Sequence, residues 1–295
     1  MSIVVAFVTF FPVTTKAQGP AARDYLNTPV YAARFFMDVL GTNGETAADS
    51  DVPLPNNVII TRNGFVSLLY SFPLAGRYGG VQVSGGYASV KVNGPLGSVE
   101  TSGFTDPSIT FHANFFGAPA LRPDEFSQAV AQTYASFHLT VNAPLGSYDR
   151  NSAPNTGANR WAFTPVFNLD ITPDKGVSWI DLYAGARFVT HNNEYLGNNQ
   201  LSQNPLMVLT AHYSHNIGKR MYASIGVHYD NGGQSFINHV PQNDYANGFR
   251  PQVSIGRKFG KLFIALRYEN TSSRPNAAPT NGLISLRVSG PLYPF

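Results

Sequence analysis

The sequence has no cysteine, few charged residues and no apolar run long enough to cross a bilayer as a helix. Charged residues make up 13% of the 295 residues, which is about half the share in an ordinary soluble domain. Hydrophobic residues reach only 43% and the mean hydropathy is −0.11. Since a spanning helix needs about 18 or more consecutive apolar residues, and none follow the N-terminus, helical membrane proteins are excluded.

Two further absences limit the partners of the chain. Without cysteine no disulfide can form, which is compatible with passage through the oxidising periplasm. The sequence pI is about 9.0, but Lys and Arg are scattered singly and form no basic run. Nucleic acid is therefore excluded as a partner.

The chain instead contains many tracts in which apolar and polar residues alternate. In residues 133–142, for example, Ala135, Phe137, Leu139 and Val141 alternate with polar residues. Successive strand side chains point to opposite faces, so each tract has one apolar and one polar face. About twelve such tracts lie near residues 30–39, 57–70, 78–90, 103–115, 126–142, 160–171, 177–188, 205–217, 220–230, 248–259, 262–270 and 281–290.

The connections between the tracts alternate between long and short, which is typical of a transmembrane antiparallel β-barrel of the Gram-negative outer membrane. Short periplasmic turns are predicted at 173–176 and 260–261, whereas residues 116–126 are long enough for a helical turn. Long extracellular loops are predicted near 40–56, 91–102, 143–159, 189–204, 231–247 and 271–280. The alternative is a soluble β-sandwich or jelly roll, which would carry a more charged exterior.

The N-terminus is predicted to divide into two segments ahead of a barrel of residues 30–295. Residues 1–17 have the apolar stretch and small-residue cleavage site of a signal peptide, with a buried first strand as the alternative. Residues 18–29 contain Arg23, Asp24, Tyr25 and Asn27. This segment is either a partial plug inside the barrel or a loose periplasmic tail.

Several segments resemble the MetA-pathway of phenol degradation family of proteobacterial outer-membrane channels. They are Arg23–Pro29, Gly103–Pro107, Phe116–Leu121, Pro144–Asp149, Asn159–Phe163 with Pro165, Asn192–Tyr195 and Gly232-Gly233, in the family's order. The resemblance implies a channel for small, rather apolar compounds associated with aromatic catabolism.

The inward faces of the predicted strands supply the candidate channel-lining residues. They are Arg34, His138, Arg160, Asp181, Arg187, His212, His228, Arg250, Arg267 and Arg287, accompanied by Asp38, Asp170, Asp230, Lys258 and Glu269. A barrel of this size has room for water and small solutes if no loop fills it. The mixed charges with a slight positive excess predict a weak preference for small anions, and cross-lumen pairing that only holds the wall in shape is the alternative.

No cofactor, metal site or catalytic site is expected. His212 and His215 are three positions apart on a strand and point to opposite faces, so they cannot share an ion. An outer-membrane phospholipase would need Ser and His on the lipid-facing side, whereas Ser136 and His138 fall on an inward face.

The stretch 155–165 predicts the outer mouth of the channel. Alternation turns Arg160 inward and puts Trp161 and Phe163 in an aromatic girdle at the membrane surface. Pro165 lies in mid-strand and cannot donate a ladder hydrogen bond, which predicts either a local bulge or a defect in the barrel wall through which apolar molecules pass.

The C-terminus partly matches an assembly signal. Phe295, with Tyr293 two residues before it, resembles the signal read by the barrel assembly machinery, provided that the strand slips at Gly290-Pro291. The other expected surroundings are outer-membrane lipid and lipopolysaccharide.

These observations predict a passive channel for small hydrophobic or aromatic molecules. The alternatives are a general diffusion porin for small polar solutes and a closed structural barrel.

Overall fold

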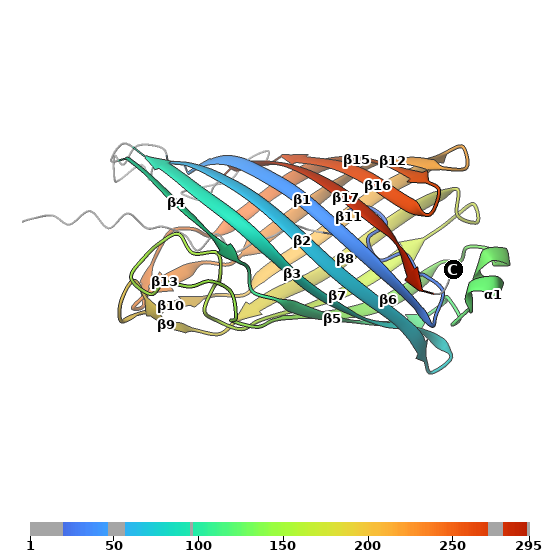
Figure 1. Cartoon of the computed structure of the whole chain (residues 1–295), viewed down its shortest axis with the longest axis horizontal. Helices are drawn as coiled ribbons and strands as arrows, with labels where there is room; N and C mark the ends of the chain where they lie inside the picture. Colours follow the sequence, from blue (N-terminus) through green and yellow to red (C-terminus); the bar gives the residue numbers. More distant parts are fainter. Residues whose placement is uncertain (1–19, 47–56, 95–96, 271–279, 294–295) are drawn as a thin grey trace, which may run out of the picture.

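The alternating tracts form antiparallel strands that close into one barrel (Figure 1). The computed structural model describes residues 20–46, 57–94, 97–270 and 280–293. In these ranges no helix is long and apolar enough to span a bilayer. The predicted signal peptide 1–17 and the terminal Phe295 lie outside the described residues.

Within the described residues, thirteen strand segments make the barrel wall. They are β1 (Ala32–Thr46), β2 (Asn57–Leu74), β3 (Arg77–Gly94), β4 (Gly97–Phe104), β5 (Ser108–Phe116), β6 (Tyr134–Asn142), β7 (Ala162–Ile171), β8 (Ser178–Val189), β11 (Leu206–Ile217), β12 (Met221–Gly232), β15 (Ala246–Phe259), β16 (Leu262–Asn270) and β17 (Thr280–Tyr293). Because β4 and β5 both pair with β3, they share one wall position, which leaves the twelve strands that the sequence predicts.

Pairing of β1 with both β2 and β17 closes the sheet. A closed barrel leaves no strand edge unpaired, which is what a strand needs in lipid. One irregularity interrupts the β1–β17 pair, since Ala33 lies opposite Tyr293 and Arg34 opposite Pro291. The slip expected at Gly290-Pro291 therefore occurs at the following residue, Leu292.

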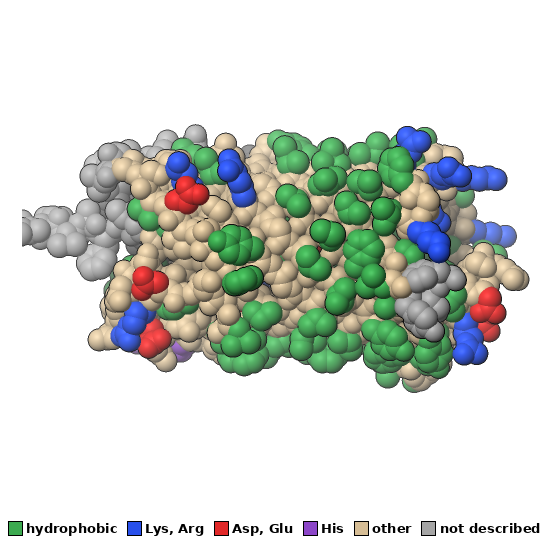
Figure 2. All heavy atoms as spheres, in the orientation of Figure 1, with side chains coloured by type: hydrophobic (Ala, Val, Ile, Leu, Met, Phe, Trp, Pro, Cys, Tyr) green, Lys and Arg blue, Asp and Glu red, His purple; other side chains and the backbone are tan. Residues whose placement is uncertain are grey.

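The two faces of the wall differ as alternation requires. Large apolar side chains such as Val39, Phe167 and Ile225 are exposed on the outside, whereas polar side chains such as Ser136, Asp170 and His228 are buried inside. Figure 2 shows the hydrophobic side chains spread over the barrel wall and most charged side chains near its two ends. The wall thus has the apolar band of an outer-membrane barrel.

The two ends of the barrel carry different connections. The helix α1 (Pro123–Gln128) lies at the end with the short turns, and its first turn is closed by a hydrogen bond from Arg122 N to Glu125 Oε2 at 2.7 Å. At the other end lies a small sheet made of β9 (Asn192–Tyr195), β10 (Asn199–Gln203), β13 (Ser235–Ile237) and β14 (Val240–Pro241). We refer to these as the turn end and the loop end; by analogy with outer-membrane barrels the loop end is extracellular.

Several predicted boundaries are wrong. The expected long loop 91–102 is mostly strand, because β3 pairs with β2 as far as Asn93 and forms a hairpin with β4 from Tyr87 to Gly94. The expected loop 40–56 begins only after Thr46, and the predicted strand 126–142 begins at Tyr134, after α1. The Gly- and Ser-rich sequence of β4 has low strand propensity and is held by backbone pairing to β3, so local composition gives little sign of it.

Candidate functional site

The N-terminal segment, residues 21–28, lies inside the barrel and contacts its wall on several sides. Arg23 extends toward β8 and β11. Its backbone N–H donates to Asp181 Oδ2 at 2.9 Å, Nε donates to Ser214 Oγ at 2.8 Å, and Nη1 donates to Asn216 Oδ1 at 2.6 Å. The guanidinium lies 4.5 Å from the centre of the Tyr222 ring, a cation–π contact. Burial lowers the pKa of Arg23, and Tyr222 and Asp181 oppose that shift.

The residues after Arg23 reach other strands. Asp24 accepts from Arg287 Nη1 of β17 at 2.5 Å, and the Tyr25 ring stacks on His138 of β6 with 3.9 Å between ring centres. Asn27 Oδ1 accepts from Asn114 Nδ2 of β5 at 3.0 Å. The segment therefore crosses the lumen from β5 and β6 to β17. The predicted plug residues Arg23, Asp24, Tyr25 and Asn27 are the residues that make these contacts.

Tyr134 of β6 holds the same segment by its hydroxyl group. The hydroxyl donates to the Tyr25 carbonyl oxygen at 3.2 Å and accepts from the Asn27 backbone N–H at 3.2 Å. The Tyr134 side chain is buried. One phenol thus fixes two backbone positions of the segment.

A network of charged and polar side chains covers the inner wall from β12 to β16. Arg250 is within 2.9 Å of Asp230 and 2.7 Å of Glu269, and His228 is 2.9 Å from Asp230. Each acid lies on a strand next to the arginine, so neighbouring strands are tied from inside. Such buried charges are tolerated because they are paired.

The network extends to β11 through His212. Its Nε2 lies 2.8 Å from Gln252 Oε1, two strands away, and Gln252 Nε2 donates to Glu269 Oε2 at 2.9 Å. Gly226 stands between His212 and Gln252 in the sheet, and a Cβ there would lie 2.0 Å from the imidazole. The glycine therefore allows the histidine to reach across the intervening strand.

A cavity of about 640 Å³ remains beside the N-terminal segment. Five arginines and three aspartates line it: Arg23, Arg34, Arg187, Arg267, Arg287, Asp24, Asp38 and Asp106. Apolar and aromatic side chains line it as well: Phe36, Leu40, Phe65, Leu69, Val166, Leu206, Val208 and Phe263. The lumen is thus neither a purely polar channel nor a closed apolar core.

The described strands put the candidate lining residues on inward positions, but in different groups. His228 and Arg250 belong to the inner-wall network and His212 extends it, whereas Asp181 and Arg287 hold the N-terminal segment. Arg34, Arg187 and Arg267 line the cavity. His138 lies within hydrogen-bonding distance of Ser136 and His112, under the Tyr25 ring. Lys258 has inward parity but is exposed beside the turn 260–261.

The aromatic pair before Pro165 lies on the outer surface at the loop end. Trp161 and Phe163 are exposed and stack with 6.5 Å between ring centres. Arg160 precedes them and is buried, 3% exposed. The alternation across 160–163 is thus preserved although β7 begins only at Ala162.

The ladder between β7 and β8 is interrupted at Pro165. Phe163 pairs with Phe188 and Val166 with Gly185, but neither Thr164 nor Pro165 has a partner on β8. A bulge would insert an extra residue in one strand and shift the register. The register is the same on both sides of Thr164 and Pro165, so the two residues simply lack pairing with β8. Thr164 and Val166, on either side of the proline, line the cavity, and the Val166 side chain packs over Gly185, where an added Cβ would lie 2.8 Å from Val166 Cγ2.

The long loop 143–161 is fastened by contacts that the sequence alone does not reveal. Asp106, in the break between β4 and β5, accepts from Gly146 N at Oδ1 and from Ala158 N at Oδ2, both at 2.9 Å. Only the tertiary structure brings residues 40 and 52 positions apart to this carboxylate.

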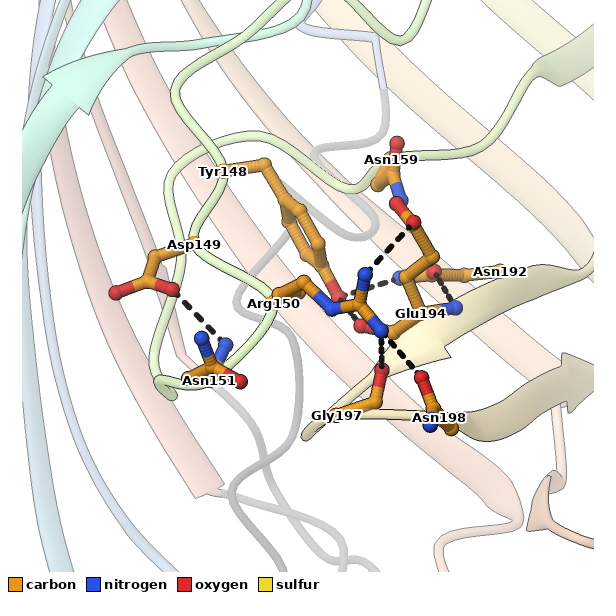
Figure 3. A network of polar contacts seen from close by, with 9 residues as sticks. All are labelled: Tyr148, Asp149, Arg150, Asn151, Asn159, Asn192, Glu194, Gly197 and Asn198. Atoms are coloured by element: carbon orange, nitrogen blue, oxygen red, sulfur yellow. Dashed lines mark hydrogen bonds and ion pairs between the residues drawn. The ribbon is translucent and has the colours of Figure 1, made fainter.

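A second group of contacts joins this loop to β9 (Figure 3). Asn192, 1% exposed, donates to Tyr148 Oη at 2.9 Å and accepts from Glu194 N at 3.0 Å. Arg150 donates to Glu194 Oε1 at 3.3 Å, to the Gly197 carbonyl oxygen at 3.1 Å and to Asn198. The two loops therefore form one unit over the loop end.

Comparisons with known proteins agree on the class of fold. The family model described as "Putative MetA-pathway of phenol degradation" matches residues 13–288. The solved COG4313 outer membrane channel from Pseudomonas putida F1 superposes with a TM-score of 0.80 at 19% identity, covering 93% of this chain and all of that one (100%). The β domain of the Bordetella autotransporter BrkA superposes with a TM-score of 0.54 at 9% identity, covering 88% and 99% of the two chains. None of the curated proteins matches the sequence.

Proposed function

Because the chain belongs to the family described as putative MetA-pathway of phenol degradation, we propose that it is a passive, non-enzymatic outer-membrane channel for small hydrophobic or aromatic molecules. The structural similarity to a protein named as an outer membrane channel supports the proposal. The surroundings that we propose are outer-membrane lipid and lipopolysaccharide, with insertion by the barrel assembly machinery.

The observation that carries the proposal is the mixed lining of the cavity. In a barrel with a water-filled pore the inward face is polar. Here Phe65, Leu69, Val208 and Phe263 are inward residues that line the cavity together with arginines. Such a lining can hold an aromatic ring and still hydrate a polar substituent. Modest affinity suffices, because a solute that is held too tightly does not leave.

The experiment is uptake into proteoliposomes that contain the full mature chain and carry lipopolysaccharide in the outer leaflet, because a plain phospholipid bilayer passes toluene without help. We expect an aromatic probe such as toluene to enter them faster than liposomes of the same lipids without the chain, whereas a hydrophilic sugar such as arabinose enters no faster. Equal acceleration of both probes would indicate a general diffusion porin. Acceleration of neither would indicate a closed structural barrel.

We further propose that residues 18–29 act as a partial plug. The contacts of Arg23, Asp24 and Tyr25 with opposite sides of the wall support this role. The cavity beside the segment is the space through which a small solute would pass.

The gap at Pro165 supports a sideways exit from the cavity into the membrane. The carbonyl oxygen of Pro165 points toward β8, where a Cβ on Gly185 would lie 2.7 Å from it. The N–H and C=O of a strand residue face the same neighbour, so the N–H that proline lacks is missing from this ladder.

Replacing Pro165 with Val tests the exit. Valine restores a donor and we expect toluene uptake to fall several-fold, since one ladder hydrogen bond contributes about 0.5–1.5 kcal/mol to keeping the strands together. Pro251→Val is the control, because Pro251 is also a strand proline that pairs on one side, with Val227, but on the other side it lies just past the end of the β15–β16 ladder and interrupts no pairing. Unchanged uptake in Pro165→Val would remove the exit from the proposal.

A further inference from the structure

Two arginines at the loop end of the lumen have hydrogen-bond donors that the protein does not use. Arg160 donates from Nη2 to Gln203 Oε1 at 2.9 Å, but its buried Nε and Nη1 have no partner among the described residues. Arg187 lines the cavity, and no residue in the described part of the chain forms a hydrogen bond or an ion pair with its side chain. Buried donors without partners are unfavourable and rare in proteins.

The two arginines are also close enough to affect one another. Burial and, to a smaller extent, the neighbouring charge of Arg187 lower the pKa of Arg160 to about 10, whereas Asp244 and Asp106 oppose this shift. Both groups remain charged at neutral pH. An anion placed between them would relieve this repulsion.

The nearby carboxylates are already engaged with backbone groups. The two carboxylate oxygens of Asp106 accept hydrogen bonds from Gly146 N and Ala158 N, at 2.9 Å each. Asp244 Oδ1 accepts one from Ser235 N at 2.6 Å. Neither acid forms an ion pair with Arg160 or Arg187 within the described ranges. The guanidinium groups therefore retain free donors although acids lie within electrostatic range.

An apolar surface adjoins the donors of Arg187. Leu206 pairs with Arg187 in the sheet, and Leu206, Val208 and Val166 line the same cavity as Arg187. A ligand there would meet fork-shaped cationic donors at one end and aliphatic side chains along its body. Guanidinium groups match carboxylates particularly well, because both are planar and can form paired hydrogen bonds.

We propose that Arg160 and Arg187 bind the carboxylate of a small aromatic acid at the loop end of the lumen, with its ring against Leu206 and Val208. The inference rests on the proposed channel function and names a substrate class for it. The site would select aromatic acids before they pass the N-terminal segment.

The test is calorimetric titration of the purified full chain in detergent with benzoate and with benzamide, its uncharged analogue of similar shape. We expect benzoate to bind about tenfold more tightly or better, the ratio typical of losing a hydrogen bond to a charged group. Arg160→Gln and Arg187→Gln should each reduce this preference. Arg62→Gln, which removes an exposed arginine from the outside of β2, should leave it unchanged.

Several results would overturn the site. They are equal binding of benzoate and benzamide, an undiminished preference in both Gln variants, and competition by inorganic phosphate as strong as that by benzoate. Heat-modifiable migration in gels shows whether each variant is folded. If Arg160→Gln does not fold, Arg160→Lys replaces it, because lysine keeps the charge but cannot form the paired hydrogen bonds of a guanidinium. A partial loss of the preference for benzoate in Arg160→Lys, together with a loss in Arg187→Gln, would then support the site.

Toluene uptake separates this inference from the proposed function. If toluene crosses but the protein binds benzoate no more tightly than benzamide, the proposed carboxylate site is wrong and the channel function stands. If toluene does not cross, the channel function itself is wrong, whatever benzoate does.

Discussion

Asn192 and Arg150 show why exposure matters in the loop network. Arg150 donates to three groups, but its side chain is 44% exposed and that of its partner Glu194 is 53% exposed. Exposed ion pairs contribute about 0–1 kcal/mol, because water screens them and two long side chains must be ordered. Asn192 is buried and satisfies groups that water cannot reach.

We therefore expect Asn192→Ala to loosen the loops more than Arg150→Ala. Removing a buried partner leaves unsatisfied groups and costs about 1–3 kcal/mol. Amide hydrogen exchange in residues 192–198 should accelerate about tenfold or more in Asn192→Ala, and only slightly in Arg150→Ala. Equal acceleration in the two variants would contradict this ranking.

Among the elements, the N-terminal segment has no regular secondary structure and depends on side chains for its position. Its sequence mixes polar and aromatic residues but has no period, so the sequence left a plug and a loose tail equally open. The contacts of Tyr134 and Arg287 with this segment come from β6 and β17. No local pattern could have connected them.

Deleting residues 18–29 should raise single-channel conductance in planar bilayers, because the segment occupies the cross-section of the lumen. Arg23→Lys is the conservative control: it keeps the charge but loses part of the bonding to Ser214 and Asn216, so a smaller increase is expected. An unchanged current after the deletion would count against a plug.

The sequence predicted where most strands lie better than it predicted which side chains meet across neighbouring strands. Period-two alternation gave β16 at residues 262–270, the bounds found in the structure. It missed the extension of β4 and the small loop-end sheet, whose sequences are rich in Gly, Ser and Asn. Alternation also turned Arg250 inward, but only sheet register sets it between Asp230 and Glu269. Phe36, Phe65 and Phe263 are apolar residues that point into the otherwise polar lumen. They occupy inward positions of their strands, so alternation applied to every residue of a strand predicts their direction.

For the whole molecule, the charge of the cavity predicts weak anion selectivity. Arginines outnumber aspartates five to three in its lining, and Asp24 and Asp38 are both paired with Arg287. Because both signs are present, the preference for chloride over potassium should stay below about tenfold. Reversal potentials across a salt gradient measure it, and a clear cation preference would contradict the prediction.

Arg34→Gln should weaken the preference for chloride, whereas Arg62→Gln on the outer surface should not.

The pairing of Asp24 with Arg287 joins residues 263 positions apart, one just before the first strand and one in the last. β1 cannot pair with β17 until nearly the whole chain is available. Contacts this distant in sequence form late, because the loop they close is long. The contact of Asp24 with Arg287 needs the same last strand. Sealing the barrel and anchoring the segment that fills its lumen therefore both wait for β17.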